Sequence, residues 1–250
     1  MKPQYRQLKI IDLLRRAGQA SVDELALEFK ASPETIRRDL SVLARNGKII
    51  KVHGGALLPR SQGEGSFQQR MSENIVAKRI IAEKASQLIA SGDTLFIDTG
   101  STTLIFAEEI ASIKNLIVVT NSTEIAKVIA TNNTSQVFLL GGEYNADNRQ
   151  TTGTMALSQL DHFYAQHAIL TIGSLSMTTG ALDFNQKEAA IARAMLKRAK
   201  NSILLADSSK FNRRGTFVVA KLNEFDQLVC DIEPNQALKA ELLANDVEVI

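Results

Sequence analysis

The sequence is poor in the residues that build disulfide frameworks and metal centres. Its 250 residues include one cysteine, Cys230, and three histidines scattered along the chain. A single cysteine excludes a disulfide-stapled fold and a zinc ribbon, and three separate histidines are too few for a histidine-rich metal site. We therefore expect no metal and no other cofactor.

Long apolar runs are also missing. No stretch approaches the roughly 18 apolar residues that a membrane-spanning helix needs. The first six residues are polar and basic, and no apolar segment of a secretory signal follows them. With 44% apolar and 22% charged residues, the composition is close to the globular average. These features predict a soluble, cytoplasmic protein with one large domain or two smaller ones.

Charge is unevenly distributed along the chain. Residues 1–60 contain twelve Lys or Arg and six Asp or Glu, whereas residues 61–250 contain 17 and 21. A basic head on an acidic body indicates two modules with different partners. Polyanionic nucleic acid is the expected partner of the head.

Apolar spacing in the head predicts three helices and a hairpin. The helices are expected at about residues 5–16, 22–29 and 33–46, and Ser21 and Ser32 are placed to cap the second and third. Ile36, Leu40 and Leu43 form an apolar stripe on the third helix, with arginines on the opposite face, a pattern that suits entry into the major groove. Residues 48–55 alternate as a basic hairpin, or wing, that would lie along phosphates. The alternative is a three-helix protein-interaction domain with solvated arginines.

The body reads as a separate α/β domain. Residues 58–75 contain Pro59, Gly63 and Gly65 among polar residues, which predicts a linker. Helical and strand patterns alternate after it and indicate a largely parallel sheet. The expected organisation is a winged helix-turn-helix domain over residues 1–57, a linker over 58–75 and an α/β domain over 76–250.

Five short apolar runs in the body end in small or polar residues. Each fits a buried parallel strand. Open α/β sheets bind ligands outside the carboxyl ends of their strands, so these five ends predict a polar crevice. The runs and the residues that follow them are 95–97 before Asp98-Thr-Gly, 116–119 before Thr120-Asn-Ser, 137–140 before Gly141-Gly142, 169–172 before Gly173-Ser, and 203–206 before Asp207-Ser-Ser-Lys210.

The segment Asp98-Thr-Gly-Ser-Thr-Thr103 is the most specific of these ends. It lies between a strand and a helix that starts near Thr102. Glycine allows close backbone approach, hydroxyls donate hydrogen bonds, and a helix N-terminus offers N–H groups to a phosphate or carboxylate. The rival interpretation is the Asp-Thr-Gly-Ser of an aspartic protease, but that requires a second such motif or a small all-β homodimer.

Three parts of the head form a specific motif: Ser32-Pro-Glu-Thr-Ile-Arg-Arg-Asp-Leu40, Leu43 and Lys51-Val-His-Gly-Gly-Ala56. This motif resembles the DNA-binding signature of DeoR-type bacterial transcriptional regulators. It implies that residues 35–38 lie in a recognition helix. Asp39 would orient a neighbouring arginine, or pair on the helix surface with a residue four positions away. The residues expected at DNA are Ser32, Glu34, Thr35, Arg37, Arg38, Ser41, Arg45, Lys48, Lys51 and His53.

Residues 76–250 resemble the effector domain of the same family, which is similar in fold to ribose 5-phosphate isomerase. This resemblance implies a phosphorylated sugar or related anionic metabolite as effector. Asp98 would hold sugar hydroxyls and Lys210 an anion, although Lys210 could equally be a solvated loop lysine. The residues expected at the effector are Asp98, Thr99, Gly100, Ser101, Thr102, Thr103, Asn121, Ser122, Gly141, Gly142, Thr152, Gly153 and Lys210.

One segment departs from the family pattern. Gly173-Ser174-Leu175-Ser176 stands where the family commonly has Gly-x-Asp-Gly. An acid that could contact sugar hydroxyls is therefore absent, and the effector is expected to differ from the usual sugar phosphate.

Two functions compete at this point. The favoured one is a ligand-responsive repressor of a carbohydrate-catabolism operon, a non-enzymatic protein that binds operator DNA as a homo-oligomer, a dimer or a tetramer. The alternative is a sugar-phosphate isomerase with an appended helix-turn-helix. That enzyme would need a carboxylate base, for which Asp98, Asp183, Glu188 and Asp207 are available, but no paired-acid motif singles one out. We assign no catalytic residue.

Overall fold

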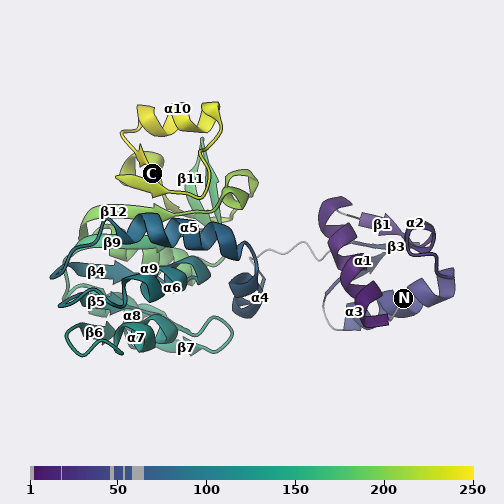
Figure 1. The fold of residues 1–250 in the computed structure, drawn as a ribbon, viewed down its shortest axis with the longest axis horizontal. Helices are drawn as coiled ribbons and strands as arrows, with labels where there is room; N and C mark the ends of the chain where they lie inside the picture. The colour runs from purple at the N-terminus through teal and green to yellow at the C-terminus, as the bar shows by residue number, and fades with distance from the viewer. Residues whose placement is uncertain (1–2, 18, 46–47, 53, 58–64) are drawn as a thin grey trace. The chain divides into compact units, whose positions relative to one another are not determined.

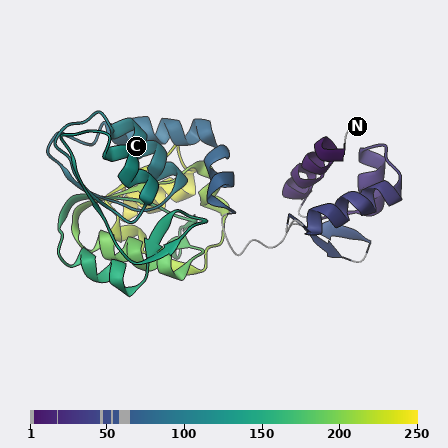
Figure 2. The same cartoon turned by 90° about the horizontal axis from the view of Figure 1, so that it is seen from below.

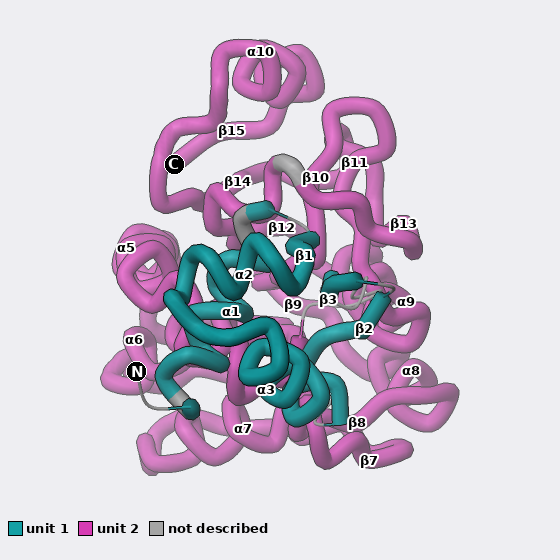
Figure 3. The backbone as a smooth tube through the Cα atoms, turned by 90° about the vertical axis from the view of Figure 1, so that its right-hand side faces the viewer, with its two compact units in different colours: residues 1–62 teal, residues 63–250 magenta. Residues whose placement is uncertain are grey.

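The computed structural model describes residues 3–17, 19–45, 48–52, 54–57 and 65–250. The chain divides into two units, residues 1–62 and residues 63–250, which Figure 3 distinguishes by colour. Each unit has an apolar core of its own. The two units are therefore described separately.

The first unit is a winged helix-turn-helix domain, as predicted (Figure 1). Its helices share a core that includes Ile10, Leu25 and Leu40. Its three strands form an antiparallel sheet in the order β1-β3-β2, and the β2–β3 hairpin is the expected wing. Strand β1 was not predicted, because three residues are too few to show an alternating pattern. The elements are α1 (Pro3–Ala17), β1 (Gln19–Ser21), α2 (Val22–Glu28), α3 (Pro33–Arg45), β2 (Ile50–Val52) and β3 (Gly55–Leu57).

Local capping signals set the starts of α2 and α3. Ser21 Oγ accepts the N–H of Glu24 at 3.1 Å, and the Glu24 carboxylate accepts the N–H of Ser21 at 2.7 Å. This reciprocal pair is a capping box. At α3, Ser32 Oγ accepts the N–H of Thr35 at 3.2 Å. Both serines therefore cap helices, as their positions in the sequence predict.

The second unit is built on a seven-stranded parallel sheet. Its order is β15-β14-β12-β9-β4-β5-β6, and every neighbouring pair is parallel. This confirms the α/β prediction, and the five apolar runs all contribute strands. The strands are β4 (Thr94–Ile97), β5 (Ile117–Thr120), β6 (Gln136–Leu139), β9 (Ala165–Thr171), β12 (Ala199–Leu205), β14 (Gln227–Val229) and β15 (Glu248–Val249).

Helices cover both faces of this sheet (Figure 2). Leu95 and Ile97 of β4 join one apolar cluster and Phe96 joins the other, because successive side chains of a strand point to opposite faces. The first cluster is completed by α4 (Phe67–Ser72), α5 (Ile75–Ser86), α6 (Ser101–Ile110) and α7 (Thr123–Ile129), and the second by α8 (Thr154–Leu160), α9 (Gln186–Leu196) and α10 (Gln236–Ala244).

Strand β6 differs from the prediction of a buried strand. It is the last strand at one edge of the sheet, and Phe138 and Leu139 remain 41% and 45% exposed. A continuous apolar run does not distinguish a central strand from an edge strand, since strand order is a tertiary property.

Antiparallel elements were not predicted in the body. A hairpin of β7 (Glu143–Asn145) and β8 (Gln150–Thr152) follows β6, and a separate sheet has the order β10-β11-β13. The strands of that sheet are β10 (Ser174–Ser176), β11 (Gly180–Asp183) and β13 (Phe217–Ala220). Two short 3-10 helices complete the unit, η1 (Ser208–Asn212) and η2 (Leu222–Glu224). These strands have at most four residues, so they carry little periodic signal.

The segment expected to be a linker, residues 58–75, contains helix α4. Ser66 caps this helix, with its Oγ accepting the N–H of Gln69 at 3.2 Å. Phe67 and Arg70 of α4 are buried. Residues 58–64 lie outside the described part of the chain. A helix of six residues is too short to show a helical period in the sequence, so α4 was not predicted.

Candidate functional site

The outward face of α3 carries most of the residues expected at DNA. Arg37, Arg38 and Arg45 are exposed, while Ile36, Leu40 and Leu43 are buried beneath them. A helix anchored by one stripe and studded with arginines on the other side can present those arginines to a groove. The exposed Glu34 carboxylate lies 3.6 Å from Arg37 Nη1, a contact too solvated to hold the arginine firmly.

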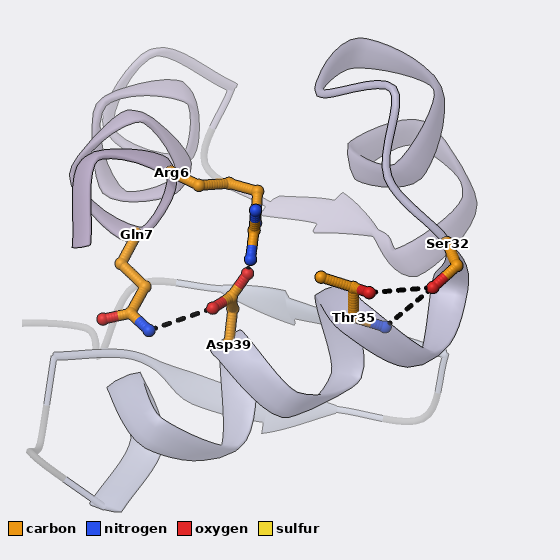
Figure 4. A network of polar contacts seen from close by, with 5 residues as sticks. All are labelled: Arg6, Gln7, Ser32, Thr35 and Asp39. Carbon is orange, nitrogen blue, oxygen red and sulfur yellow. Dashed lines mark hydrogen bonds and ion pairs between the residues drawn. The ribbon is translucent and has the colours of Figure 1, made fainter. Parts of the chain in front are cut away.

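The polar residues of α3 have mainly structural partners. Ser32 and Thr35 bond to each other at the start of the helix, with 2.8 Å between their hydroxyl oxygens (Figure 4). Ser41 Oγ donates to the carbonyl of Arg37 at 2.7 Å and accepts a hydrogen bond from Lys51 Nζ at 3.1 Å. The last contact joins strand β2 of the wing to α3. Lys48 is exposed, and His53 lies outside the described residues.

Asp39 links α3 to α1 through a buried ion pair. Arg6 Nε donates to Asp39 Oδ2 at 2.5 Å, and Gln7 Nε2 donates to Asp39 Oδ1 at 2.9 Å (Figure 4). Asp39 is only 4% exposed, so the surface pairing four residues along the helix is wrong. Asp39 was also expected to orient a neighbouring arginine, and it instead binds Arg6 of α1, which is distant in sequence. Asp39 is therefore a positioning residue that fixes the angle of α3.

In the body, the DTGST loop (Asp98–Thr102) and the start of α6 form a candidate anion site. α6 follows Gly100, and no side chain among the described residues caps its N-terminus. The first N–H groups of a helix have no acceptor within the helix and carry partial positive charge. Ser101 and Thr102 are buried beside them. A phosphate or carboxylate would complete these hydrogen bonds.

Asp98 in this loop and Thr103 directly after it form hydrogen bonds that stabilise the carboxyl end of the sheet. The two carboxylate oxygens of Asp98 accept the N–H of Thr171 at 3.1 and 3.2 Å, which ties the end of β4 to the end of β9. Thr103 Oγ1 donates to the carbonyls of Asp98 and Gly100 at 2.9 and 3.2 Å. The Thr99 hydroxyl is buried and has no hydrogen-bond partner within the described ranges.

The residues after β5 and β6 also have structural partners. Ser122 Oγ caps α7 by accepting the N–H of Ile125 at 3.3 Å. The N–H of Gly141 donates to Gln159 at 3.0 Å. Gly142 and Gly153 have φ values of +151° and +93°, which favour glycine. Thr152 is buried in the adjoining strand β8.

Asn121 is different from these neighbours. Its Nδ2 donates to Gln150 Oε1 at 3.2 Å and to the carbonyl of Thr151 at 3.1 Å. Its Oδ1 is buried and accepts no hydrogen bond from any described residue. A buried acceptor without a donor is costly. Asn121 therefore has one polar atom available to a ligand.

Three buried cations add positive charge to the body. Lys210 is only 8% exposed, which overturns its interpretation as a solvated loop lysine, and it lies in η1 directly after β12. Arg70 of α4 and Lys78 of α5 are also buried and were not predicted. Lys78 Nζ donates to the carbonyl of Arg70. Burying a cation is expensive unless other groups compensate it, and all three side chains have partners within the protein.

A sequence signal for Lys78 does exist. It lies three, four and seven residues before Ile81, Ala82 and Ala85, the buried stripe of α5. A lysine on the apolar stripe of a helix is a candidate buried cation. No comparable signal marks Arg70, because α4 itself was not predicted.

The segment that departs from the family pattern has a structural role here. Ser174 is fully buried, and its Oγ accepts the N–H of Gly215 at 2.8 Å. This bond holds the start of β10 against the loop that precedes β13. Leu175, which stands at the place of the family's acid, is buried in the apolar core, so the segment offers no carboxylate to a ligand.

Comparison with known proteins identifies both units. Residues 6–62 match the DeoR-like helix-turn-helix domain, and residues 73–232 match the DeoR C-terminal sensor domain. The chain belongs to the DeoR family of transcription regulators. Its N-terminal unit is a DNA-binding domain and its body a sensor domain, so both the protein-interaction interpretation of the head and the aspartic-protease interpretation of the DTGST loop are wrong.

Named relatives of this DeoR-family chain are transcriptional repressors. The glycerol-3-phosphate regulon repressor of Escherichia coli is 30% identical over 249 residues, which cover 100% of this chain and 99% of that protein. The repressor CsqR of the same organism is 29% identical and the alignment covers 99% and 94%. The repressor GlcR of Bacillus subtilis is 29% identical and the alignment covers 100% and 96%.

Solved structures resemble the DeoR-family chain only distantly. Ribose 5-phosphate isomerase A of Methanocaldococcus jannaschii aligns with 56% of this chain and 55% of its own, with a TM-score of 0.42 and 16% identity. A score this low carries no functional argument. Among the described residues, no helix could span a membrane and no cluster of His, Cys, Asp or Glu could hold a metal ion.

Replacing Asp39 with alanine is expected to destabilise the DNA-binding unit. The change removes the carboxylate that Arg6 binds in a buried site, and breaking such a pair costs about 3–5 kcal/mol. Urea denaturation, with hydrogen exchange of α1 and α3 peptides, measures the loss. The double variant Arg6→Met/Asp39→Leu should recover most of it. An Asp39→Ala variant as stable as the wild type would contradict the anchoring role.

Replacing Arg38 with alanine is expected to weaken specific DNA binding. Arg38 is exposed on α3, and the loss of a base contact costs roughly 1–3 kcal/mol. The measurement is a titration with a duplex selected by the wild-type protein from genomic fragments. Arg79→Ala, which removes an exposed arginine from α5 of the body, is the matched control. Equal affinities of the two variants would remove Arg38 from the interface.

Replacing Gly100 with valine is expected to block the anion site. A Cβ atom there would lie 2.2 Å from Thr171 Cγ2 and 3.0 Å from Thr103 Oγ1, so the loop must shift. We expect loss of ligand-induced release from DNA, with DNA binding itself unchanged. Gly141→Ala is the control, because its Cβ would meet only the flexible Gln159 side chain, at 3.3 Å. Release of Gly100→Val at wild-type ligand concentrations would exclude this cradle.

Proposed function

We propose that this DeoR-family protein represses a carbohydrate-catabolism operon and is released from DNA by a phosphorylated sugar or related anionic metabolite. It acts in the cytoplasm as a homo-oligomer, a dimer or a tetramer, because paired half-sites multiply affinity. The observation that carries the proposal is the uncapped N-terminus of α6, in a body that also buries two polar atoms without a hydrogen-bond partner among the described residues, Thr99 Oγ1 and Asn121 Oδ1.

A phosphorylated sugar would satisfy both features. The helix N–H groups and the Thr99 hydroxyl can donate hydrogen bonds to a phosphate, and a sugar hydroxyl can donate one to Asn121 Oδ1. The relatives named for glycerol 3-phosphate agree with a phosphorylated ligand. Because Leu175 occupies the place of the family's acid, the effector here makes fewer contacts through its hydroxyls at that position.

The positions of the carboxylates favour a regulator over an enzyme. Asp98 accepts hydrogen bonds from the Thr171 backbone, and Asp183 Oδ1 accepts them from the next two backbone N–H groups. Glu188 accepts from two side-chain amides, and Asp207 accepts from Asn74 and the Ser209 backbone. A general base needs a carboxylate oxygen directed at the substrate. All four carboxylates are engaged in holding loops and strands together.

Cys230 is equally unsuited to nucleophilic catalysis. Burial raises the pKa of its thiol to about 11, so the thiol is protonated at neutral pH. No catalytic role is therefore assigned to it.

A thermal-shift screen tests the proposed effector class. We expect glycerol 3-phosphate, ribose 5-phosphate or glucose 6-phosphate to raise the melting temperature, whereas the unphosphorylated compounds do not. A ligand at 100 times its Kd stabilises by about 2.7 kcal/mol. Lys210→Met should abolish the shift, and Lys200→Met, which removes an exposed lysine of β12, should retain it.

The same compounds distinguish the alternative function. Any compound that binds should also release the protein from its selected duplex. Steady conversion of a sugar phosphate by the purified protein would instead establish the isomerase, and no shift with any phosphorylated compound would exclude the proposed effector class.

A further inference from the structure

A chain of side-chain hydrogen bonds runs from the candidate crevice to the first helix of the body. At the crevice end, Asn121 Nδ2 donates to Gln150 Oε1 at 3.2 Å. Gln150 Nε2 donates to Glu188 Oε1 at 2.6 Å, and Asn148 Nδ2 donates to the same oxygen at 2.8 Å. Arg70 Nη2 of α4 donates to Asn148 Oδ1 at 3.2 Å.

We propose that these five residues form a relay that couples ligand occupancy at Asn121 to the position of α4. The relay consists of Asn121, Gln150, Glu188, Asn148 and Arg70. It rests on the proposed function, because that function identifies the crevice as the ligand site.

The relay has one hydrogen-bonding arrangement, because the Glu188 carboxylate can only accept hydrogen bonds and the Arg70 guanidinium can only donate them. Gln150 and Asn148 each use the amide oxygen on one side and the amide nitrogen on the other. Turning the Gln150 amide over would set its nitrogen against Asn121 Nδ2 and its oxygen against the Glu188 carboxylate, and both contacts are repulsive. Neither amide can therefore turn while the relay is intact. The network is either formed in this arrangement or broken, and this formed-or-broken element is what coupling between two sites requires.

The crevice end of the relay is built to take a hydrogen-bond donor. Asn121 is 1% exposed, and its Oδ1 accepts no hydrogen bond within the described part of the chain. A hydroxyl group of the effector that donates to this oxygen would remove the cost of the unsatisfied acceptor. It would also hold the Asn121 amide in the orientation that bonds Gln150. The effector therefore stabilises the relay as it stands.

The other end of the relay controls a helix next to the DNA-binding unit in sequence. α4 is the first described helix after residues 58–64, which lead from the helix-turn-helix domain. The β7–β8 loop contacts α4 twice, through Asn148 and through Arg149, which lies 5.8 Å from the centre of the Phe67 ring. Arg149 also pairs with Glu124 of α7 at 3.1 Å. α4 is thus fastened to the loop that the relay organises.

Hydrogen exchange of the full-length protein tests the relay without any ligand. We expect Asn121→Ala to speed exchange of the α4 amides by about two- to tenfold, the scale of one lost hydrogen bond. In an Asn148→Ala background the same change at Asn121 should have no further effect on α4. In an Asp147→Ala background, which alters an exposed residue of the same loop, the effect of Asn121→Ala should persist.

Asn148 is partly exposed, so its alanine variant is expected to fold, and circular dichroism checks this. If Asn121→Ala leaves α4 exchange unchanged, or changes it equally with and without Asn148, the relay is overturned. If the Asn121 variant does not fold, Gln150→Glu in the same backgrounds makes the test, because it replaces the donor to Glu188 with a like charge.

Ribose 5-phosphate then separates this inference from the proposed function. In the wild type and in Asp147→Ala it should slow α4 exchange, whereas Asn148→Ala should bind it with a similar Kd and show no change in α4. A wild-type effect retained in Asn148→Ala would contradict the relay. Failure of every sugar phosphate to bind would exclude the effector class, and the ligand-free comparison would still decide the relay.

Discussion

The parallel direction of all seven strands is the constraint on which the body of this protein depends. Parallel strands bring all their carboxyl ends to one edge of the sheet, so the residues that follow β4, β5 and β12 meet there although they are far apart in sequence. Asp98 and Asn121 follow two neighbouring strands, β4 and β5, and Lys210 lies in η1, which follows β12. The antiparallel hairpin β7–β8 packs across the end of β5 and supplies the amides of the relay.

Buried charge organises both units in the same way. In the DNA-binding unit, the ion pair of Asp39 and Arg6 joins α3 to α1. This pair fixes the orientation of α3 and therefore of its exposed arginines. In the sensor unit, Glu188 gathers two amides and Arg70 extends the network to α4. Charges in such places are costly to leave unpaired, so they hold their partners in defined positions. Specific geometry at each surface thus comes from polar contacts beneath it.

Much of this fold could be predicted because its signals are local. Ile36, Leu40 and Leu43 lie on one face of α3, and Ser32 caps this helix. The five adjacent residues of the DTGST loop are enough to predict an anion site. Elements of three to six residues were not predicted, among them β1, the hairpin β7–β8 and α4, because so few residues show no helical or strand periodicity.

The amino-acid sequence by itself determined the family, the two-unit organisation, the arginine-bearing helix of the helix-turn-helix and the strands of the parallel sheet. Only the tertiary structure decided which of the expected site residues form hydrogen bonds within the fold. Ser122, Thr103 and Gly141 carry the residue types of a binding site, yet their hydrogen bonds go to the protein. Arg70 and Lys78 are buried outside the strand ends, and their hydrogen bonds also go to the protein. The physical reason is that a side chain's partners depend on burial and on neighbours distant in the chain, which no local pattern records.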